Sequence, residues 1–307
     1  MSKFYDLLSS MIRRINDSVK TVDGMAGDSN GNVRISRPYN LLDNSDFRNP
    51  VDQRGLGCYE VVSNAPQYTI DRWYCKCGLV DHTDVLEGRC VHLFYDQVNS
   101  ELPALMQYID SKLIVDDKKY TFAIRDEIRG TFLISGKFKD TVDEYDLEMS
   151  YDDSKSAYVV KIKSAFRLVW AALYEGEYTL DTLPDYVPKG YGAELVECQR
   201  YYVGFGSDAY SCVFAAFAST ATNIRATIPV PVVMRTTPTC SLTAENIRCY
   251  MNSGSTTATI TPTNIDSITQ INNCIVLRLT VDSTTAGSAG VMRIKDAASA
   301  FEFSADF

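Results

Sequence analysis

Short segments rich in β-branched and aromatic residues recur along the middle of the chain, and this feature most limits its fold. Glycine, aspartate, serine or proline separates them, and several alternate apolar with polar residues. The segments span residues 68–77, 119–125, 130–135, 145–151, 158–163 and 166–173. These residue types favour β-strands. Because no long helical pattern lies between the segments, the sequence predicts antiparallel sheets rather than a parallel sheet with helical crossovers.

The predicted domains follow from where this pattern begins and ends. Residues 41–188 suit a β-sandwich of the jelly-roll kind, with residues 101–114 as a helical turn or a long loop. A stretch with several prolines and glycines, 184–193, predicts a boundary, followed by a short helix over 194–202. Residues 189–307 are then expected to form a smaller β-domain. The predicted class is mainly β.

The last part of the chain has a distinct composition. Residues 236–307 are rich in threonine and serine, and only ten of these 72 side chains are charged. Strands are predicted over 256–261 and 274–281. Low charge on such strands is typical of a surface that something covers, and identical neighbours in an oligomer are the simplest cover.

The N-terminal segment predicts a helix over residues 3–22, within an N-terminal region of 1–23. Apolar side chains follow a seven-residue repeat, with Leu8, Ile15 and Val22 at one position and Phe4 and Met11, followed by Ser18, at the other. The helix could pack on its own domain or form a short coiled coil between chains. Residues 24–40 read as a flexible linker, which favours the coiled coil. We therefore assign oligomerisation to Leu8, Met11, Ile15 and Val22.

Charge and hydropathy exclude several classes of function. The net charge of −9 disfavours nucleic-acid binding, which needs cationic side chains. The longest apolar runs, 168–174 and 212–218, are far shorter than the roughly 18 residues of a membrane span. Charged residues also interrupt the place where a secretory signal has its apolar core. We expect folding in a cytosol, with most of the nine scattered cysteines reduced and buried.

Three segments carry a resemblance to a known family. They are the stretch 40–55, which begins Asn-Leu-Leu-Asp-Asn, the run Tyr-Thr-Ile-Asp-Arg-Trp at 68–73, and residues 195–202 followed by Pro-Val-Pro at 229–231 and Met-Arg-Thr-Thr-Pro-Thr at 234–239. Together they resemble tail-fibre and related appendage proteins of bacteriophages and prophages, over roughly residues 40–307.

The resemblance implies a carbohydrate-binding-like jelly roll, a C-terminal domain at the tip of a fibre, and a homotrimer. It also implies a place in the virion, assembled in the bacterial cytoplasm. The N-terminus would contact other virion proteins, and the fibre would contact a host surface polysaccharide. Family members often have a longer N-terminal part than the 40 residues found here. Tail fibre, baseplate protein and head fibre therefore all stay open.

Residues inside these segments have physical interpretations of their own. Trp73 is expected in the core, with sugar stacking as the alternative. A regular strand would put Ile70 and Arg72 on one face, and Asp71 and Trp73 on the other. Gln53 and Arg54 are expected to fasten an irregular loop to the sandwich, with ligand binding as the alternative.

Two clusters are candidate chemical sites. Cys75, Cys77, His82, Cys90 and His92 could bind zinc or form a disulfide, but apolar or edge positions on two strands are the simpler interpretation. The acidic stretches at 140–148 and 152–153 could hold calcium or a hydrolase pair, although a solvated strand face is simpler. The two histidines leave little room for histidine-based catalysis.

The functional prediction is a non-catalytic virion protein that binds a glycan, without a metal or a cofactor and with unidentified ligand residues. One alternative is a head fibre, decoration or baseplate protein without its own receptor. A polysaccharide depolymerase using Asp143, Glu144 or Asp146 is another.

Overall fold

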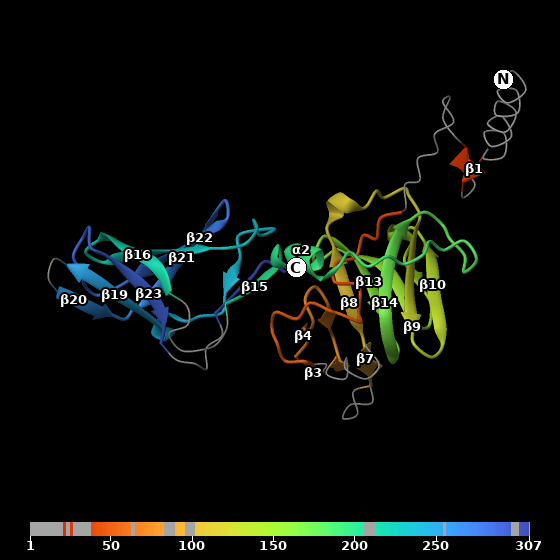
Figure 1. Cartoon of the computed structure of the whole chain (residues 1–307), viewed down its shortest axis with the longest axis horizontal. Coiled ribbons are helices and arrows are strands. Elements are labelled where there is room, and N and C mark those ends of the chain that lie inside the picture. Colours follow the sequence, from red (N-terminus) through yellow and green to blue (C-terminus); the bar gives the residue numbers. More distant parts are fainter. Residues whose placement is uncertain are drawn as a thin grey trace, which may run out of the picture. The chain divides into compact units, whose positions relative to one another are not determined.

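The computed structural model describes residues 21–22, 25–26, 38–62, 65–82, 90–95, 102–205, 213–253, 256–295 and 301–306. The chain forms two compact units, Met1–Tyr39 and Asn40–Phe307. The fold is mainly β, with several antiparallel sheets, as predicted (Figure 1). No helix in the described ranges is long and apolar enough to cross a membrane.

In the first unit, β1 (Thr21–Val22) pairs with β2 (Met25–Ala26) in an antiparallel ladder. The helix predicted over 3–22 is therefore wrong at its last two residues, and Val22 lies in a strand rather than at a heptad position. The β-branched residues Thr21 and Val22 favour a strand, and the intervening sequence Asp-Gly is typical of hairpins. Residues 3–20, including Leu8, Met11 and Ile15, lie outside the described residues.

The second unit begins with two six-stranded antiparallel sheets. The first has the order β10-β9-β14-β7-β6-β3, and the second β11-β12-β13-β8-β5-β4. The strands of the first sheet are β3 (Cys58–Val61), β6 (Gly78–Asp81), β7 (Val91–Phe94), β9 (Tyr120–Asp126), β10 (Gly130–Gly136) and β14 (Phe166–Glu175). The strands of the second are β4 (Gln67–Tyr68), β5 (Tyr74–Cys75), β8 (Leu105–Ile109), β11 (Val142–Asp143), β12 (Leu147–Asp152) and β13 (Ala157–Ile162).

These two sheets share one hydrophobic core. Phe122 and Leu173 enter it from the first sheet, and Leu105 and Val160 from the second. Trp73 is fully buried there, which confirms its predicted core position, and its ring centroid lies 5.1 Å from that of Phe47. Full burial of one large apolar side chain stabilises a fold by about 1.5–3 kcal/mol. This core is therefore the main source of the sandwich's stability.

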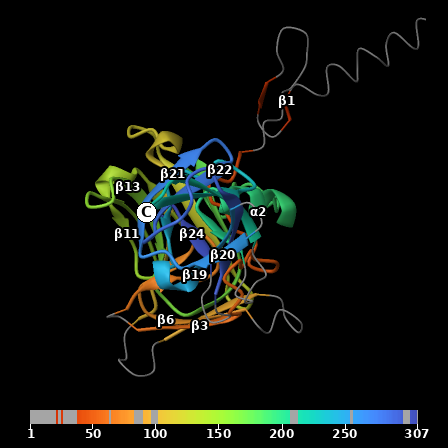
Figure 2. The same ribbon diagram turned by 90° about the vertical axis from the view of Figure 1, so that its left-hand side faces the viewer.

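A separate core lies in the C-terminal part, between a seven-stranded and a three-stranded antiparallel sheet (Figures 1 and 2). The seven-stranded sheet, ordered β20-β19-β23-β16-β17-β22-β21, has β16 (Val213–Thr220), β17 (Asn223–Pro229), β19 (Ile247–Ser253), β20 (Thr256–Ile260), β21 (Asn264–Ile271), β22 (Cys274–Thr280) and β23 (Ala289–Ile294). The smaller sheet has β15 (Tyr202–Gly204), β18 (Thr239–Cys240) and β24 (Glu302–Ser304). The strands predicted over 256–261 and 274–281 are confirmed as β20 and β22.

The helical elements are short. Helix α2 (Tyr191–Gln199) lies between the two cores and confirms the predicted helix, shifted by three residues (Figure 1). The 3-10 turns are η2 (Ser111–Leu113), η3 (Phe138–Asp140) and η4 (Ala244–Asn246).

Two sequence predictions fail within the sandwich. The strand predicted over 68–77 is interrupted, because residues 70–73 form a tight turn in which the Trp73 amide donates to the Ile70 carbonyl (3.0 Å). Arg72 has a φ of +70° there, and all four side chains are buried, so the alternation expected of a regular strand does not apply. Residues 101–114, predicted as a helical turn or a long loop, contain a helical turn at η2 but also β8, a strand buried along its whole length that was not predicted. A strand covered on both faces shows no alternation.

Candidate functional site

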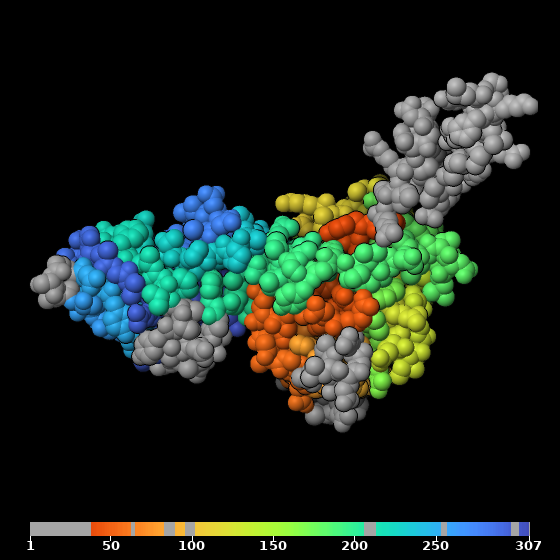
Figure 3. Space-filling model, viewed as in Figure 1, coloured from red at the N-terminus to blue at the C-terminus, as the bar shows by residue number. Residues whose placement is uncertain are grey.

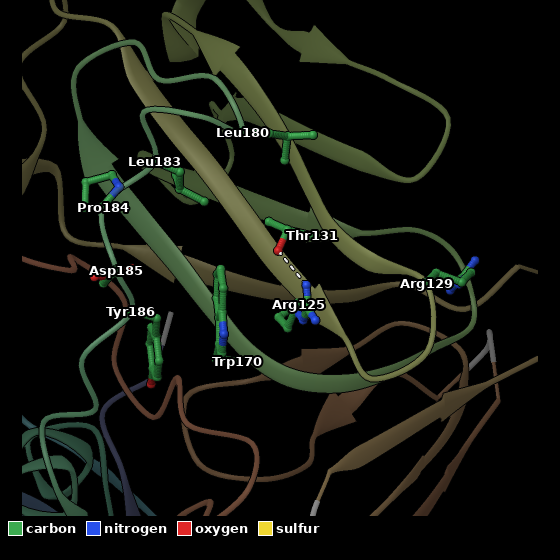
Figure 4. A pocket seen from close by; sticks show the side chains of 9 residues that line it. All are labelled: Arg125, Arg129, Thr131, Trp170, Leu180, Leu183, Pro184, Asp185 and Tyr186. Carbon is green, nitrogen blue, oxygen red and sulfur yellow. Dashed lines mark hydrogen bonds between the residues drawn. The ribbon is translucent and has the colours of Figure 1, made fainter.

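An open groove lies on the outer face of β14, β9 and β10 (Figure 4). The strand register places Trp170 opposite Arg125, and Arg125 opposite Thr131. Partners across neighbouring strands point to the same face and lie about 5 Å apart. The three side chains therefore form a continuous row across the sheet, and this row is the floor of the groove.

A β-bulge sets the direction of Trp170. The pairing of β14 with β9 shifts between Leu168 and Trp170, which leaves Val169 as the extra residue. In a regular strand, Leu168 and Trp170 would point to the same face. Leu168 instead faces the core, and Trp170 faces outward. Bulges often redirect a side chain in this way beside functional sites.

The segment 176–188 runs across this part of the molecule (Figure 3), and its residues 180 and 183–186 form one rim of the groove. It is fastened to the sheet because the Tyr178 amide donates to Thr121 Oγ1 (3.0 Å) and Ser135 Oγ donates to the Tyr178 carbonyl (3.3 Å). Ala123 and Ala172 are fully buried. Arg125 remains exposed and Trp170 half-buried, so the groove opens where the covering segment ends.

Tyr186 stacks on one face of the Trp170 indole. The two ring centroids are 5.0 Å apart and the rings are 5° from parallel. The Tyr186 hydroxyl lies 3.2 Å from Ser45 Oγ, and burial raises the Tyr186 pKa. Arg125 and Thr131 lie on the other side of the indole (Figure 4). The indole is thus held in place on one side and faces the groove on the other.

Two arginines border this aromatic pair. Arg125 Nη1 donates to Thr131 Oγ1 over 3.3 Å. Arg129 is held more tightly, with its guanidinium carbon 4.1 Å from the Phe166 ring centroid and Nη2 3.4 Å from Asp126 Oδ2. Burial acts to raise the Asp126 pKa, but hydrogen bonds from the Arg129, Arg167 and Ile128 amides lower it below its usual range. Asp126 is therefore an ionised anchor for the turn that carries Arg129.

The groove has a volume of about 750 Å³, within the range of roughly 300–1,000 Å³ that ligand sites occupy. Its lining consists of Arg125, Arg129, Thr131, Trp170, Leu180, Leu183, Pro184, Asp185 and Tyr186. Among these described residues, Asp185 is the one carboxylate. Glycoside hydrolysis commonly needs two carboxylates. The lining therefore suits ligand binding by an aromatic ring and hydrogen-bonding arginines better than acid–base chemistry.

The segments singled out in the sequence meet elsewhere, in a buried cluster that we call the polar junction. It consists of Asp43, Gln53, Arg54, Asp71, Arg72, Tyr201, Tyr202, Arg235 and Asp306. Gln53 Nε2 donates to Asp71 Oδ2 (2.6 Å) and Arg54 Nη1 to Asp71 Oδ1 (3.0 Å), which confirms that Gln53 and Arg54 fasten their loop.

The polar junction also ties the sandwich to the C-terminal part. The Arg72 guanidinium lies 3.4 Å from the Tyr201 ring centroid and pairs with Asp43 at 3.0 Å. Arg235 donates to the carbonyls of Ala305 (3.1 Å) and Asp306 (3.3 Å). Burial raises the pKa of Asp71 to about 7 and also raises that of Asp306. The resembling segments therefore have a shared structural role here.

Among the described residues, the five candidate zinc ligands do not converge on one point, although Cys75 and Cys77 are neighbours. Their side chains contact the Cys77 carbonyl from Cys75, the Leu102 carbonyl from Cys77, Asp52 from His82, Glu127 from Cys90 and Phe94 from His92. In the described part of the chain, no three His, Cys, Asp or Glu side chains are placed to hold a metal ion. The eight cysteines described carry free thiols.

The acidic stretches run from the end of η3 through β11, the turn that carries Glu144 and Asp146, and β12, to the turn after β12. Asp143 pairs with Lys163, and Glu148 Oε1 lies 2.6 Å from Lys161 Nζ. Asp152 accepts the Ser154 hydroxyl at 2.6 Å. These carboxylates neutralise neighbouring lysines and cap a turn, which fits the solvated strand face.

Sequence reasoning did not single out Trp170 and Tyr186. Trp170 looked like one more apolar residue of a strand, because a bulge leaves no mark in the pattern of residue types. Tyr186 lies in the stretch read as a domain boundary. The one available signal was an aromatic residue inside a proline-rich connection, Pro-Asp-Tyr-Val-Pro at 184–188.

Comparison with family models, with curated proteins and with solved structures finds no match to the chain.

Proposed function

We propose that this chain is a structural protein of a phage virion, a tail fibre or similar appendage, that binds a host cell-surface glycan without turning it over. The observation that carries the glycan part is the groove: a half-buried indole, braced by Tyr186, faces an open channel beside Arg125 and Thr131. Sugar rings have apolar C–H faces and hydroxyl groups at their edges. An aromatic ring can contact the C–H face, and neighbouring polar side chains can hydrogen-bond to the hydroxyls.

A jelly-roll arrangement of the sandwich is part of this proposal. Two six-stranded antiparallel sheets packed around one core, with sequence-distant strands such as β14 and β7 as neighbours, support it. The sheet that bears the groove is braced on its other face by that core, so the row from Trp170 to Thr131 stands on a rigid support.

The homotrimer is proposed from the C-terminal part. Val213 and Phe217 lie on the face of β16 opposite its core and are 47% and 45% exposed. They belong to a seven-stranded sheet rich in threonine, and the strand register sets Arg293 beside Val213 and Arg225 beside Phe217 on this face. Packing against sister copies would cover this face, and three copies would multiply weak glycan contacts. The N-terminus would carry the attachment to other virion proteins.

Two measurements test the proposal. Light scattering of the purified protein should give three times 34.3 kDa, and an array of bacterial surface polysaccharides should show binding without release of oligosaccharides. Binding with oligosaccharide release would replace the proposal with a depolymerase. A trimer that binds no polysaccharide would favour a head fibre, decoration or baseplate protein, and a monomer would contradict the fibre.

A further inference from the structure

The charge inside the groove differs from that of the whole chain. The protein carries a net charge of −9, whereas the charged residues that line the groove are two arginines and one aspartate. In the described part of the chain, no carboxylate forms an ion pair with the Arg125 guanidinium, which is exposed and donates only to the Thr131 hydroxyl. Among the described residues, an acidic protein thus presents in its groove an arginine without a carboxylate partner.

The neighbouring arginines show that this is a local property. Arg129 already contacts Asp126 and donates to the Ala165 carbonyl at 2.5 Å, and Arg167 lies 3.6 Å from Glu127. Their hydrogen-bonding capacity is partly used by the protein itself. Of the three arginines, Arg125 has the guanidinium group that is most available to a ligand.

The position of Arg125 beside Trp170 adds a geometric constraint. The two are cross-strand partners on one face, so their side chains lie about 5 Å apart at the backbone. A six-membered sugar ring lying against the open side of the indole would bring a substituent at its edge to the guanidinium. A carboxylate there would accept two parallel N–H bonds, the geometry that arginine favours.

From these observations we infer that the groove takes an acidic glycan, with a uronic acid or another carboxylate-bearing sugar ring against Trp170 and its carboxylate at Arg125. This inference rests on the proposed glycan-binding function and specifies its ligand class. The positive end of the groove, at Arg125 and Arg129, and the negative residue on the opposite rim, Asp185, also give the bound chain a preferred direction.

The experiment compares each acidic polymer with its own neutral form. Alginate, polygalacturonate and hyaluronan, and the same polymers after chemical reduction of their carboxyl groups, are titrated into the full-length protein by calorimetry. The acidic form of at least one polymer should bind about tenfold more tightly than its reduced form, and its affinity should fall as salt rises. Arg125→Gln should remove that difference, and Arg125→Lys should retain part of it.

Arg200→Gln is the matched control, since Arg200 is an exposed arginine directly after helix α2 that does not line the groove, and it should leave the difference intact. Equal binding of acidic and reduced polymers, or an unchanged preference in Arg125→Gln, would overturn the inference. If the reduced polymers bind and Trp170→Ala abolishes that binding, glycan binding in the groove stands and only the acidic ligand class fails. Absence of binding to every form contradicts the inference. The wider polysaccharide array then decides the proposed function separately.

Discussion

Arg54 and Asp306 are separated by 252 positions in the sequence, yet Arg54 Nη2 lies 3.3 Å from Asp306 Oδ2. The same guanidinium bonds Asp71 at 3.0 Å and sits 3.8 Å from the Tyr202 ring centroid. One side chain therefore connects the loop at 44–55, the turn at 70–73 and the end of the chain. The polar junction makes the sandwich and the C-terminal part depend on each other.

Replacing Arg54 should destabilise the whole second unit. Arg54→Ala leaves the buried Asp71 carboxylate without its bonded cation and removes one of the arginines around Asp306, a change that typically costs about 3–5 kcal/mol in the free energy of unfolding. Urea denaturation followed by circular dichroism measures the loss. Arg48→Ala removes an exposed pair with Asp46 and should cost less than about 1 kcal/mol. Similar losses in the two variants would show that the junction contributes no more than a surface ion pair.

Asp71 should give the polar junction a pH dependence. Burial raises its pKa from 3.8 to about 7, against the opposing effects of Arg54 and Gln53. A group whose pKa is raised by folding stabilises the fold fully below its unfolded pKa, and this contribution is lost as pH rises through the folded value. The stability of the wild type relative to Asp71→Asn should therefore decrease from about pH 4 to about pH 7.

Urea midpoints of both proteins across this pH range test the prediction. The comparison cancels the contributions of Asp306 and Glu194, whose pKa values burial also raises. A relative stability that is constant or increases over this range would show that Asp71 stays ionised in the fold.

The two tryptophans should differ sharply in their importance for stability. Trp73 is fully buried, and its Nε1 donates to the Asn44 carbonyl at 2.8 Å, so Trp73→Phe loses a hydrogen bond and leaves a cavity, at a cost of about 2 kcal/mol. Trp170→Phe changes a half-buried ring on the outer face and should cost less than about 1 kcal/mol. Thermal unfolding of the two variants measures the difference, and equal costs would argue against a groove position for Trp170.

Two glycine substitutions should change stability in opposite directions. Gly78 has a φ of +114°, and an added Cβ would lie 2.7 Å from the Phe94 carbonyl oxygen, so Gly78→Ala should cost about 1–3 kcal/mol. Gly192 lies in helix α2 with nothing within 4 Å of an added Cβ, so Gly192→Ala should gain about 0.5–1 kcal/mol. Denaturant midpoints that move in the same direction would contradict this view of α2.

The sequence predicted regular strands well and irregular backbone poorly. Residues 119–125 and 130–135 became β9 and β10 because their β-branched and aromatic residues favour strands. The turn at 70–73 was missed because Asp71 and Arg72 find their charge partners in distant parts of the chain. Strand β8 was missed because it is covered on both faces and so lacks alternation, and because it has fewer β-branched and aromatic residues than β9.

The candidate site could not be predicted from the sequence, for a related reason. Its floor exists only because a bulge at Val169 turns Trp170 away from the core, and its rim exists only because Tyr178 is tied to Thr121 across the sheet. Both features depend on tertiary contacts. The roles of Trp73, Gln53 and Arg54 could be predicted, since a large ring and a polar loop have few other places in a sandwich.

The most direct test of glycan binding in the groove uses the chain's two tryptophans as internal reporters. Fluorescence is recorded while a polysaccharide found to bind on the array is titrated into the wild type, Trp170→Phe and Tyr145→Ala, the last removing an exposed tyrosine that does not line the groove. We predict a saturable change in the wild type and in Tyr145→Ala, and its loss in Trp170→Phe, where only the buried Trp73 remains. An undiminished change in Trp170→Phe would contradict binding at this groove.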